Sequence, residues 1–143
     1  MKTLNQLLAL PIFFISTSTF AQNNSDALLT TSLYGTWEHV SSTYPTGDIV
    51  TYHREINFQA DGTGFCTKYE NADTLNVSFQ WEVKDSVIYL FVTNKRGVRM
   101  DGDAQQITML DLSKMYLADA FGEDQVGRVL CYQRNQEATQ VKF

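Results

Sequence analysis

The residue that most constrains the chemistry of this chain is a cation among apolar side chains. Arg54 lies in residues 49–59, where polar and apolar side chains alternate with the period of a β-strand. The apolar face of that segment carries Val50, Tyr52, Arg54, Ile56 and Phe58. A guanidinium there needs an internal acidic partner, a ligand, or a rim position in contact with solvent. With Tyr52 or Tyr69 nearby, Arg54 is a candidate for binding the carboxylate of a fatty-acid-like molecule.

Aromatic side chains dominate the other faces predicted to point inward. These are Tyr52, Phe58, Phe65, Tyr69, Phe79, Trp81, Tyr89 and Tyr132. A cavity lined with such rings can take a flat or long apolar ligand and form hydrogen bonds to its polar end. The same rings can instead simply fill a small barrel. The predicted ligand-binding residues are Tyr52, Arg54, Tyr69, Phe79, Trp81 and Tyr89.

Residue types that do catalysis or bind metals are scarce. His39 and His53 are the two histidines, and neither has a His or Cys partner at metal-ligand spacing, so we predict no metal site. His39 is interpreted as a hydrogen-bonded core residue. No nucleophile–base pair is visible, so we predict no catalytic residue and no cofactor. A binding protein is favoured over an enzyme; chemistry on a bound lipid through a Cys thiol or a Tyr is the remaining enzymatic alternative.

The N-terminus has the layout of a signal peptide. A lightly basic start precedes the apolar run 7–15, and small residues follow as far as Ala21. The run is too short to span a bilayer, so we predict cleavage after Ala21, a secreted or periplasmic location and no stable membrane insertion. Residues 22–32 are polar and predict a flexible leader.

Composition restricts the domain count and the partners. Removing residues 1–21 leaves 122 residues, which suits a single domain. The whole chain has 16 acidic and 11 basic residues. This acidic balance argues against nucleic acid or an anionic membrane as partner, whereas the oligomeric state stays open.

Alternation and turn residues predict a series of short strands. Their approximate ranges are 35–43, 49–59, 65–70, 75–83, 87–92, 105–111, 114–118 and 126–134. Asp61-Gly62 has hairpin-turn chemistry, and residues 94–103 are interpreted as a loop with, at most, a short ribbon. In 65–70, the alternation predicts that Phe65, Thr67 and Tyr69 face inward and that Cys66, Lys68 and Glu70 face outward. In residues 87–92, apolar side chains occur on both faces of the strand, which predicts that both faces are partly buried.

Eight short strands joined mostly by tight turns predict an all-β fold. The expected architecture is an eight-stranded antiparallel up-and-down β-barrel over residues 33–135, followed by a loose tail, 136–143. Closure leaves no exposed sheet edges. A β-sandwich is the alternative, but it usually requires a long crossing connection.

Gly35-x-Trp37 at the start of the first strand and Arg134 at the end of the last resemble the lipocalins of the calycin superfamily, specifically the short secreted bacterial lipocalin-like proteins. The resemblance implies that Trp37 plugs the closed end of the barrel and that Arg134 lies across it, both in structural roles. The Thr-Asp-type motif that many lipocalins carry is absent, and residues 110–113 read Leu-Asp-Leu-Ser instead. The implied function is binding of a small hydrophobic or amphipathic molecule inside the barrel. The alternative is a filled barrel that acts as a surface interaction or inhibitor module.

The two cysteines, Cys66 and Cys131, are both predicted to face outward. An oxidising compartment favours a disulfide. On an ideal barrel their strands are separated by two others, which places them roughly 14 Å apart. A disulfide requires Cα atoms within about 7 Å, so we predict that no intramolecular disulfide joins them.

Overall fold

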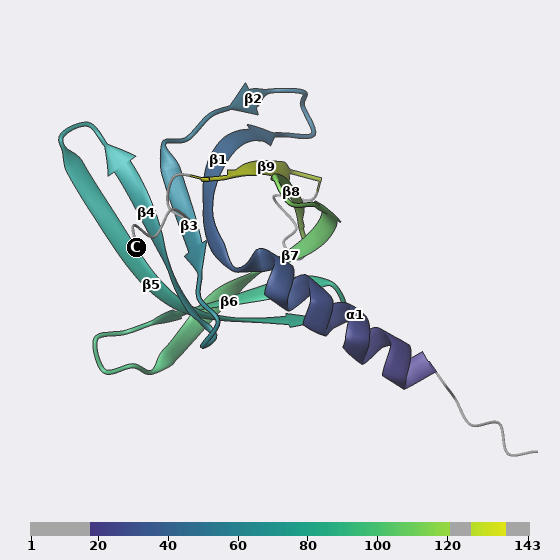
Figure 1. The fold of residues 1–143 in the computed structure, drawn as a ribbon. Helices are drawn as coiled ribbons and strands as arrows, with labels where there is room; N and C mark the ends of the chain where they lie inside the picture. Colours follow the sequence, from purple (N-terminus) through teal and green to yellow (C-terminus); the bar gives the residue numbers. More distant parts are fainter. Residues whose placement is uncertain (1–17, 121–126, 137–143) are drawn as a thin grey trace, which may run out of the picture.

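A computed structural model describes residues 18–120 and 127–136 (Figure 1). The helix α1 (Ser18–Leu33) precedes the strands β1 (Gly35–Thr43), β2 (Ile49–Val50), β3 (Arg54–Phe58), β4 (Thr63–Glu70), β5 (Asp73–Lys84), β6 (Val87–Thr93), β7 (Arg99–Leu110), β8 (Lys114–Asp119) and β9 (Val129–Arg134). Most of the predicted signal peptide and tail lies outside the described residues. Among these residues, no helix combines the length and apolar character needed to cross a membrane.

The sheet is a closed antiparallel meander. β1 pairs with both β2 and β3, each strand from β3 to β8 pairs with the next in the chain, and β1 also pairs with β9 to close the ring. The two-residue β2 pairs with the end of β1, so β2 and β3 together form the one strand predicted at 49–59, interrupted at residues 51–53. The predicted eight-stranded up-and-down barrel is therefore confirmed.

One half of the barrel is filled by large side chains. Its buried residues include Trp37, Phe58, Trp81, Ile88, Met115, Leu117 and Leu130. The rings of Phe58 and Trp81 pack edge to face, with centroids 4.9 Å apart. The Trp81 indole N–H donates to the Thr63 carbonyl at 2.9 Å. This half is a packed core, so any ligand space must lie elsewhere.

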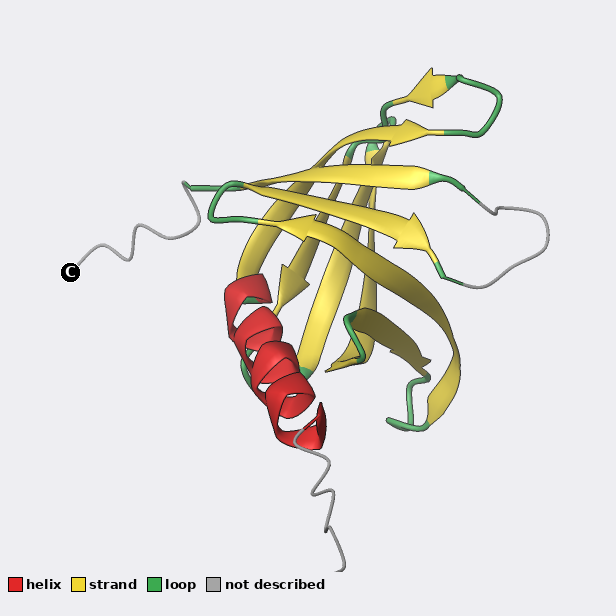
Figure 2. Cartoon of the chain, turned by 90° about the vertical axis from the view of Figure 1, so that its right-hand side faces the viewer, coloured by secondary structure: helices red, strands yellow, loops and turns green. Residues whose placement is uncertain are grey.

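The segment predicted as a flexible leader, residues 22–32, instead belongs to α1, which lies against one end of the barrel (Figure 2). Leu33 is fully buried, and its carbonyl accepts the Trp37 indole N–H at 2.8 Å. The Asp26 carboxylate accepts the backbone N–H groups of Asp85 and Ser86 at 2.9 and 3.0 Å. The leader prediction is wrong here because the helix is held by contacts distant in sequence, which leave little local apolar pattern.

The alternation of β4 is the reverse of the prediction. Cys66 is paired with Ile56 on one side and Val77 on the other, and all three line the barrel interior. Phe65 and Tyr69 are exposed on the outer side by 38% and 45%. The sequence misleads here because β4 borders an unfilled part of the barrel, where inward residues need not be apolar.

The β6–β7 hairpin is longer than predicted. β7 begins at Arg99, so much of the predicted 94–103 loop is strand. β9 begins at Val129 rather than at 126, and residue 126 lies outside the described residues. Within β1, the pairing with β9 shifts register between His39 and Ser41. This irregularity leaves both His39 and Ser42 buried, as such bulges re-aim side chains.

Candidate ligand-binding site

A cavity of about 390 Å³, here called the inner cavity, occupies the half of the barrel that the core leaves unfilled. Its apolar wall comes from β3, β5 and β6 and consists of Ile56, Val77, Phe79, Leu90 and Val92. Its polar lining includes Arg54, Lys68, Asp103, Gln105 and Tyr132. A space of this size, mostly apolar with a few polar groups, is typical of small-molecule sites.

Arg54 lies at the polar side of the inner cavity without a carboxylate partner. Its Nη2 donates to the Tyr132 hydroxyl at 2.6 Å, and its guanidinium carbon is 5.8 Å from the Tyr52 ring centroid and 5.6 Å from that of Tyr132. Its Nε is buried without a hydrogen-bond partner among the described residues. Phenols and rings therefore hold this cation, and no described acid neutralises it.

Lys68 lies directly opposite Arg54 in the β3–β4 pairing, and both side chains line the inner cavity. Like charges at directly opposite positions repel each other and destabilise the pair of strands. No ion pair to Lys68 forms within the described part of the chain. An anion placed between Arg54 and Lys68 would remove this repulsion.

A second hollow of about 240 Å³, here called the outer cavity, adjoins the first. Arg54 and Lys68 line both hollows. The rest of the outer cavity is lined by Tyr52, His53, Tyr69, Glu70 and Arg128, and it is more polar than the inner cavity. Arg128 is neutralised by Asp119 through two hydrogen bonds of 2.8 and 2.9 Å. Arg54 and Lys68, which form no ion pair with a described residue, therefore lie at the boundary between a mainly apolar space and a more polar one.

Neutral polar groups surround the Arg54 side chain. Burial, and to a lesser extent Arg54, lowers the pKa of His39, so its ring is neutral near pH 7. His39 Nδ1 lies 3.2 Å from both the backbone nitrogen and the carbonyl oxygen of Tyr52, and Nε2 shares a 2.9 Å hydrogen bond with Ser42 Oγ. Burial raises the pKa of Tyr132, so its phenol stays protonated. The Tyr132 oxygen accepts from Arg54, and its own O–H can donate to a ligand.

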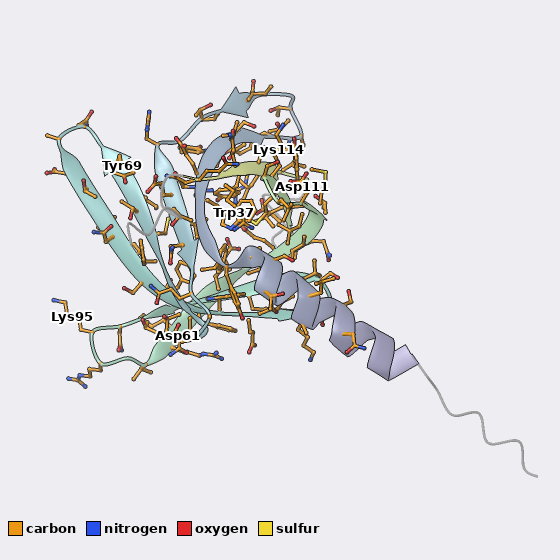
Figure 3. All side chains as sticks on the ribbon, viewed as in Figure 1. Trp37, Asp61, Tyr69, Lys95, Asp111 and Lys114 are labelled. Carbon is orange, nitrogen blue, oxygen red and sulfur yellow. The ribbon has the colours of Figure 1, made fainter. Side chains whose placement is uncertain are left out.

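The structure divides the predicted ligand-binding residues among three places. Arg54 and Phe79 line the inner cavity, and Tyr52 and Tyr69 line the outer one; Figure 3 shows Tyr69 on β4. Trp81 belongs to the packed core. Tyr89 pairs with Glu82 and faces away from the interior. The prediction for Tyr89 is wrong because apolar residues occupy both faces of that strand, so alternation could not fix its direction.

Sequence reasoning missed Lys68, Cys66 and Gln105 as lining residues. The signal for Lys68 was present, because the Asp61-Gly62 turn fixes the register that sets Lys68 opposite Arg54. Cys66 faces the inner cavity, contrary to the prediction, whereas Cys131 alternates with inward residues and lies on the other face. Both thiols are free. Within the described residues, no three His, Cys, Asp or Glu side chains gather as metal ligands.

Comparison with known proteins bears on the fold. No family model matches the sequence, and no curated protein does. The structure is similar to that of a lipocalin-like protein from Bacteroides uniformis, with a TM-score of 0.60 and 15% identity over 73% of this chain and 99% of that one. The structure is also similar to that of an uncharacterised protein from Bacteroides eggerthii, with a TM-score of 0.58 and 13% identity over 72% of this chain and 99% of that one. Together with the closed barrel, these similarities show that the chain has a lipocalin-like fold.

Proposed function

We propose that this protein binds a small amphipathic molecule whose apolar part occupies the inner cavity and whose acidic group lies between Arg54 and Lys68. The observation that carries the proposal is the placement of these two cations opposite each other at the polar side of an apolar space. Charged side chains are costly to bury unless something pairs with them. A ligand carboxylate or similar anion would supply that partner.

Physical magnitudes support this kind of ligand. Apolar surface removed from water contributes roughly 25 cal/mol per Å², so about 200 Å² of ligand tail contributes about 5 kcal/mol. Each hydrogen bond to a charged group adds about 1.5–3 kcal/mol. Lost motional freedom opposes binding by several kcal/mol. The expected affinity is therefore in the micromolar range, and the head-group contacts decide which ligand is preferred.

The decisive experiment compares two ligands that differ only in the head group. Dodecanoate and dodecanol are titrated against a fluorescent apolar probe bound to the protein. We expect dodecanoate to displace the probe at least about tenfold more effectively, because only its carboxylate pairs with the cations. Equal displacement by both, or by neither, would reject the proposal. Native mass spectrometry of protein from its own host then searches for the natural ligand.

Two variants locate the preference. Arg54→Gln should remove most of the advantage of dodecanoate while leaving dodecanol binding nearly unchanged. Lys84→Gln removes a cation from an exposed strand end outside the cavity and should keep the advantage. If Arg54→Gln retains the full preference for the acid, the anion binds elsewhere.

The filled-barrel alternative makes a different prediction, since it requires no internal space. A cavity of about 390 Å³ favours ligand binding over it. Val77→Trp places a large ring in the inner cavity. We expect this variant to fold and to lose probe binding, whereas an unchanged affinity would show that the probe binds outside the barrel.

We also propose that the protein is secreted or periplasmic, on the strength of the leader pattern in residues 1–21. Cleavage after Ala21 falls within α1 but preserves the two contacts that hold the helix, those of Asp26 and Leu33. N-terminal sequencing of protein from the host's extracellular or periplasmic fraction should begin at Gln22. An intact N-terminus on cytoplasmic protein would contradict this proposal.

A further inference from the structure

The β6–β7 hairpin carries a concentration of positive charge that the cavity does not use. Its tip, here defined as residues Thr93–Met100, includes Lys95, Arg96 and Arg99 and no acidic residue. These are three of the 11 basic residues in a chain whose formal net charge is −5. The acidic composition that argues against an anionic partner therefore does not describe this part of the surface.

The backbone of the hairpin tip forms a turn with its own hydrogen bonds. The Asn94 side chain accepts the N–H groups of Arg96 and Val98 at 2.9 and 3.1 Å. The Asn94 carbonyl accepts the N–H of Gly97 at 2.9 Å, and Gly97 has a φ of +74°, a conformation that glycine adopts without strain. The tip therefore presents its side chains from a hydrogen-bonded turn.

Among the acidic side chains that the structure describes, which do not include that of Asp101 beside the tip, none forms an ion pair with a cation of the tip. Arg99 stacks on Phe91 at 4.1 Å and donates to the Gln80 side chain at 2.7 Å. Lys95 and Arg96 are exposed, and Figure 3 shows Lys95 at the end of the hairpin. Lys95 and Arg96 are thus accessible to an external anion.

Apolar side chains stand beside these charges. Val98 is 56% exposed and Met100 is 55% exposed. Basic residues interleaved with exposed apolar ones are typical of segments that contact an anionic lipid surface, where the charges meet head groups and the apolar side chains enter the interface. A purely acidic protein surface would satisfy the charges but would leave Val98 and Met100 without a matching environment.

The hairpin tip also has a direct connection to the cavity. Val92 on β6 and Gly102 on β7, which flank the tip in sequence, line the inner cavity. The hairpin projects from the barrel on the side away from α1 (Figure 1). A surface that holds this tip would therefore lie close to one wall of the cavity.

We propose that the hairpin tip docks the protein reversibly on anionic lipid surfaces. Each Lys or Arg near such a surface strengthens association about fivefold. Three charges therefore give weak, salt-sensitive binding rather than permanent attachment. Docking does not depend on whether the cavity is occupied. A negative result for the proposed ligand binding would therefore not contradict docking, and the reverse also holds.

The test is co-flotation of the full chain with vesicles of phosphatidylcholine alone or with about a third phosphatidylglycerol. We expect binding only to the anionic vesicles and its loss in high salt. The variant Lys95→Gln/Arg96→Gln should weaken this binding about 25-fold. Arg99 is left in place because its contacts with Phe91 and Gln80 support the hairpin.

The matched control removes the same charge elsewhere. Lys84→Gln/Lys114→Gln changes two exposed cations on other parts of the barrel and should alter vesicle binding less than twofold. Equal weakening by both variants would show that only net charge matters and would overturn the proposal. No binding to anionic vesicles, or selective capture of an acidic protein by the tip instead, would also overturn it.

Discussion

The guanidinium of Arg134 lies 4.1 Å from the centroid of a ring of Trp37, and the two residues face each other in the pairing that closes the barrel. The same guanidinium donates to the carbonyls of Ser32, Tyr34 and Leu112 at 2.7, 2.6 and 2.8 Å. One side chain thus joins the end of α1, the start of β1 and the β7–β8 turn. The structural role implied for these two residues by the lipocalin resemblance matches this geometry.

Arg134→Lys should destabilise the fold although the charge is kept. An ammonium cannot reproduce the planar set of donors, so at least one carbonyl loses its partner. We expect the free energy of unfolding to fall by about 2 kcal/mol, measured by urea denaturation. Arg96→Lys, at an exposed position, is the control and should change it by less than about 0.5 kcal/mol. Equal effects of the two variants would contradict this role for Arg134.

The fold could be predicted because local patterns and global closure agree. In β5, Phe79 and Trp81 alternate with polar residues and are buried, as the period of two requires. The Asp61-Gly62 turn fixes how the β3–β4 hairpin pairs. Where one face is packed and the other wet, sequence alone determines the direction of each side chain.

The candidate site was less predictable because its walls do not follow that rule. The inward side chains of β4 include Cys66 and Lys68, while the outward ones include the rings of Phe65 and Tyr69. An unfilled cavity does not select for apolar residues, so hydrophobic alternation points to the wrong face. The helix α1 escaped prediction for a related reason, since Asp26 holds it through backbone groups 59 and 60 residues away.

Arg54→Met should separate binding from stability. Replacing a partly buried, unpaired cation with an apolar side chain of similar length removes a desolvation cost and the repulsion from Lys68. It also leaves the Tyr132 hydroxyl without its donor. We expect the free energy of unfolding to stay within about 1 kcal/mol of the unmodified protein or to rise. Affinity for dodecanoate should fall at least about tenfold.

The readouts are urea denaturation and probe displacement on the same samples. A loss of stability greater than about 2 kcal/mol would show that Arg54 supports the barrel rather than a ligand. Lys84→Met is the control, since it makes the same change at an exposed strand end. It should leave dodecanoate affinity unchanged.

Cys66 should report occupancy of the inner cavity. Burial raises the pKa of its thiol, with Arg54 and Lys68 opposing that effect less strongly. The reactive thiolate therefore forms at higher pH than in the unfolded chain, so labelling should be slow at pH 7 and should accelerate toward pH 9. Dodecanoate should slow it further, because the ligand covers the sulfur.

The labelling is measured in Cys131→Ser, so that the signal comes from Cys66 alone. Unfolded protein at the same pH gives the unhindered rate. The complementary variant Cys66→Ser should show no effect of dodecanoate on labelling of Cys131, which lies on the other face of the wall. A labelling rate at Cys66 that saturating dodecanoate leaves unchanged would show that the ligand binds outside the inner cavity.

Stability should fall as the pH drops below about 6.5, through His39. Its pKa is lowered in the fold, by burial first and by Arg54 second, from the ordinary histidine value of 6.5. Well above pH 6.5 the ring is neutral in both states and contributes no pH dependence. Below that pH, His39 binds a proton in the unfolded chain but not in the folded one. The free energy of unfolding therefore falls until the pH reaches the pKa of His39 in the fold. The slope is at most about 1.4 kcal/mol per pH unit for one proton.

Urea denaturation between pH 5.5 and 7.5 measures this slope in a window above the ordinary pKa of carboxylates. His39→Gln should flatten the slope while lowering stability at every pH, since the bonds to Tyr52 and Ser42 are lost. His53→Gln changes the other histidine, which is exposed, and should keep the slope of the unmodified protein. The same slope in His39→Gln would assign the pH dependence to groups other than this buried ring.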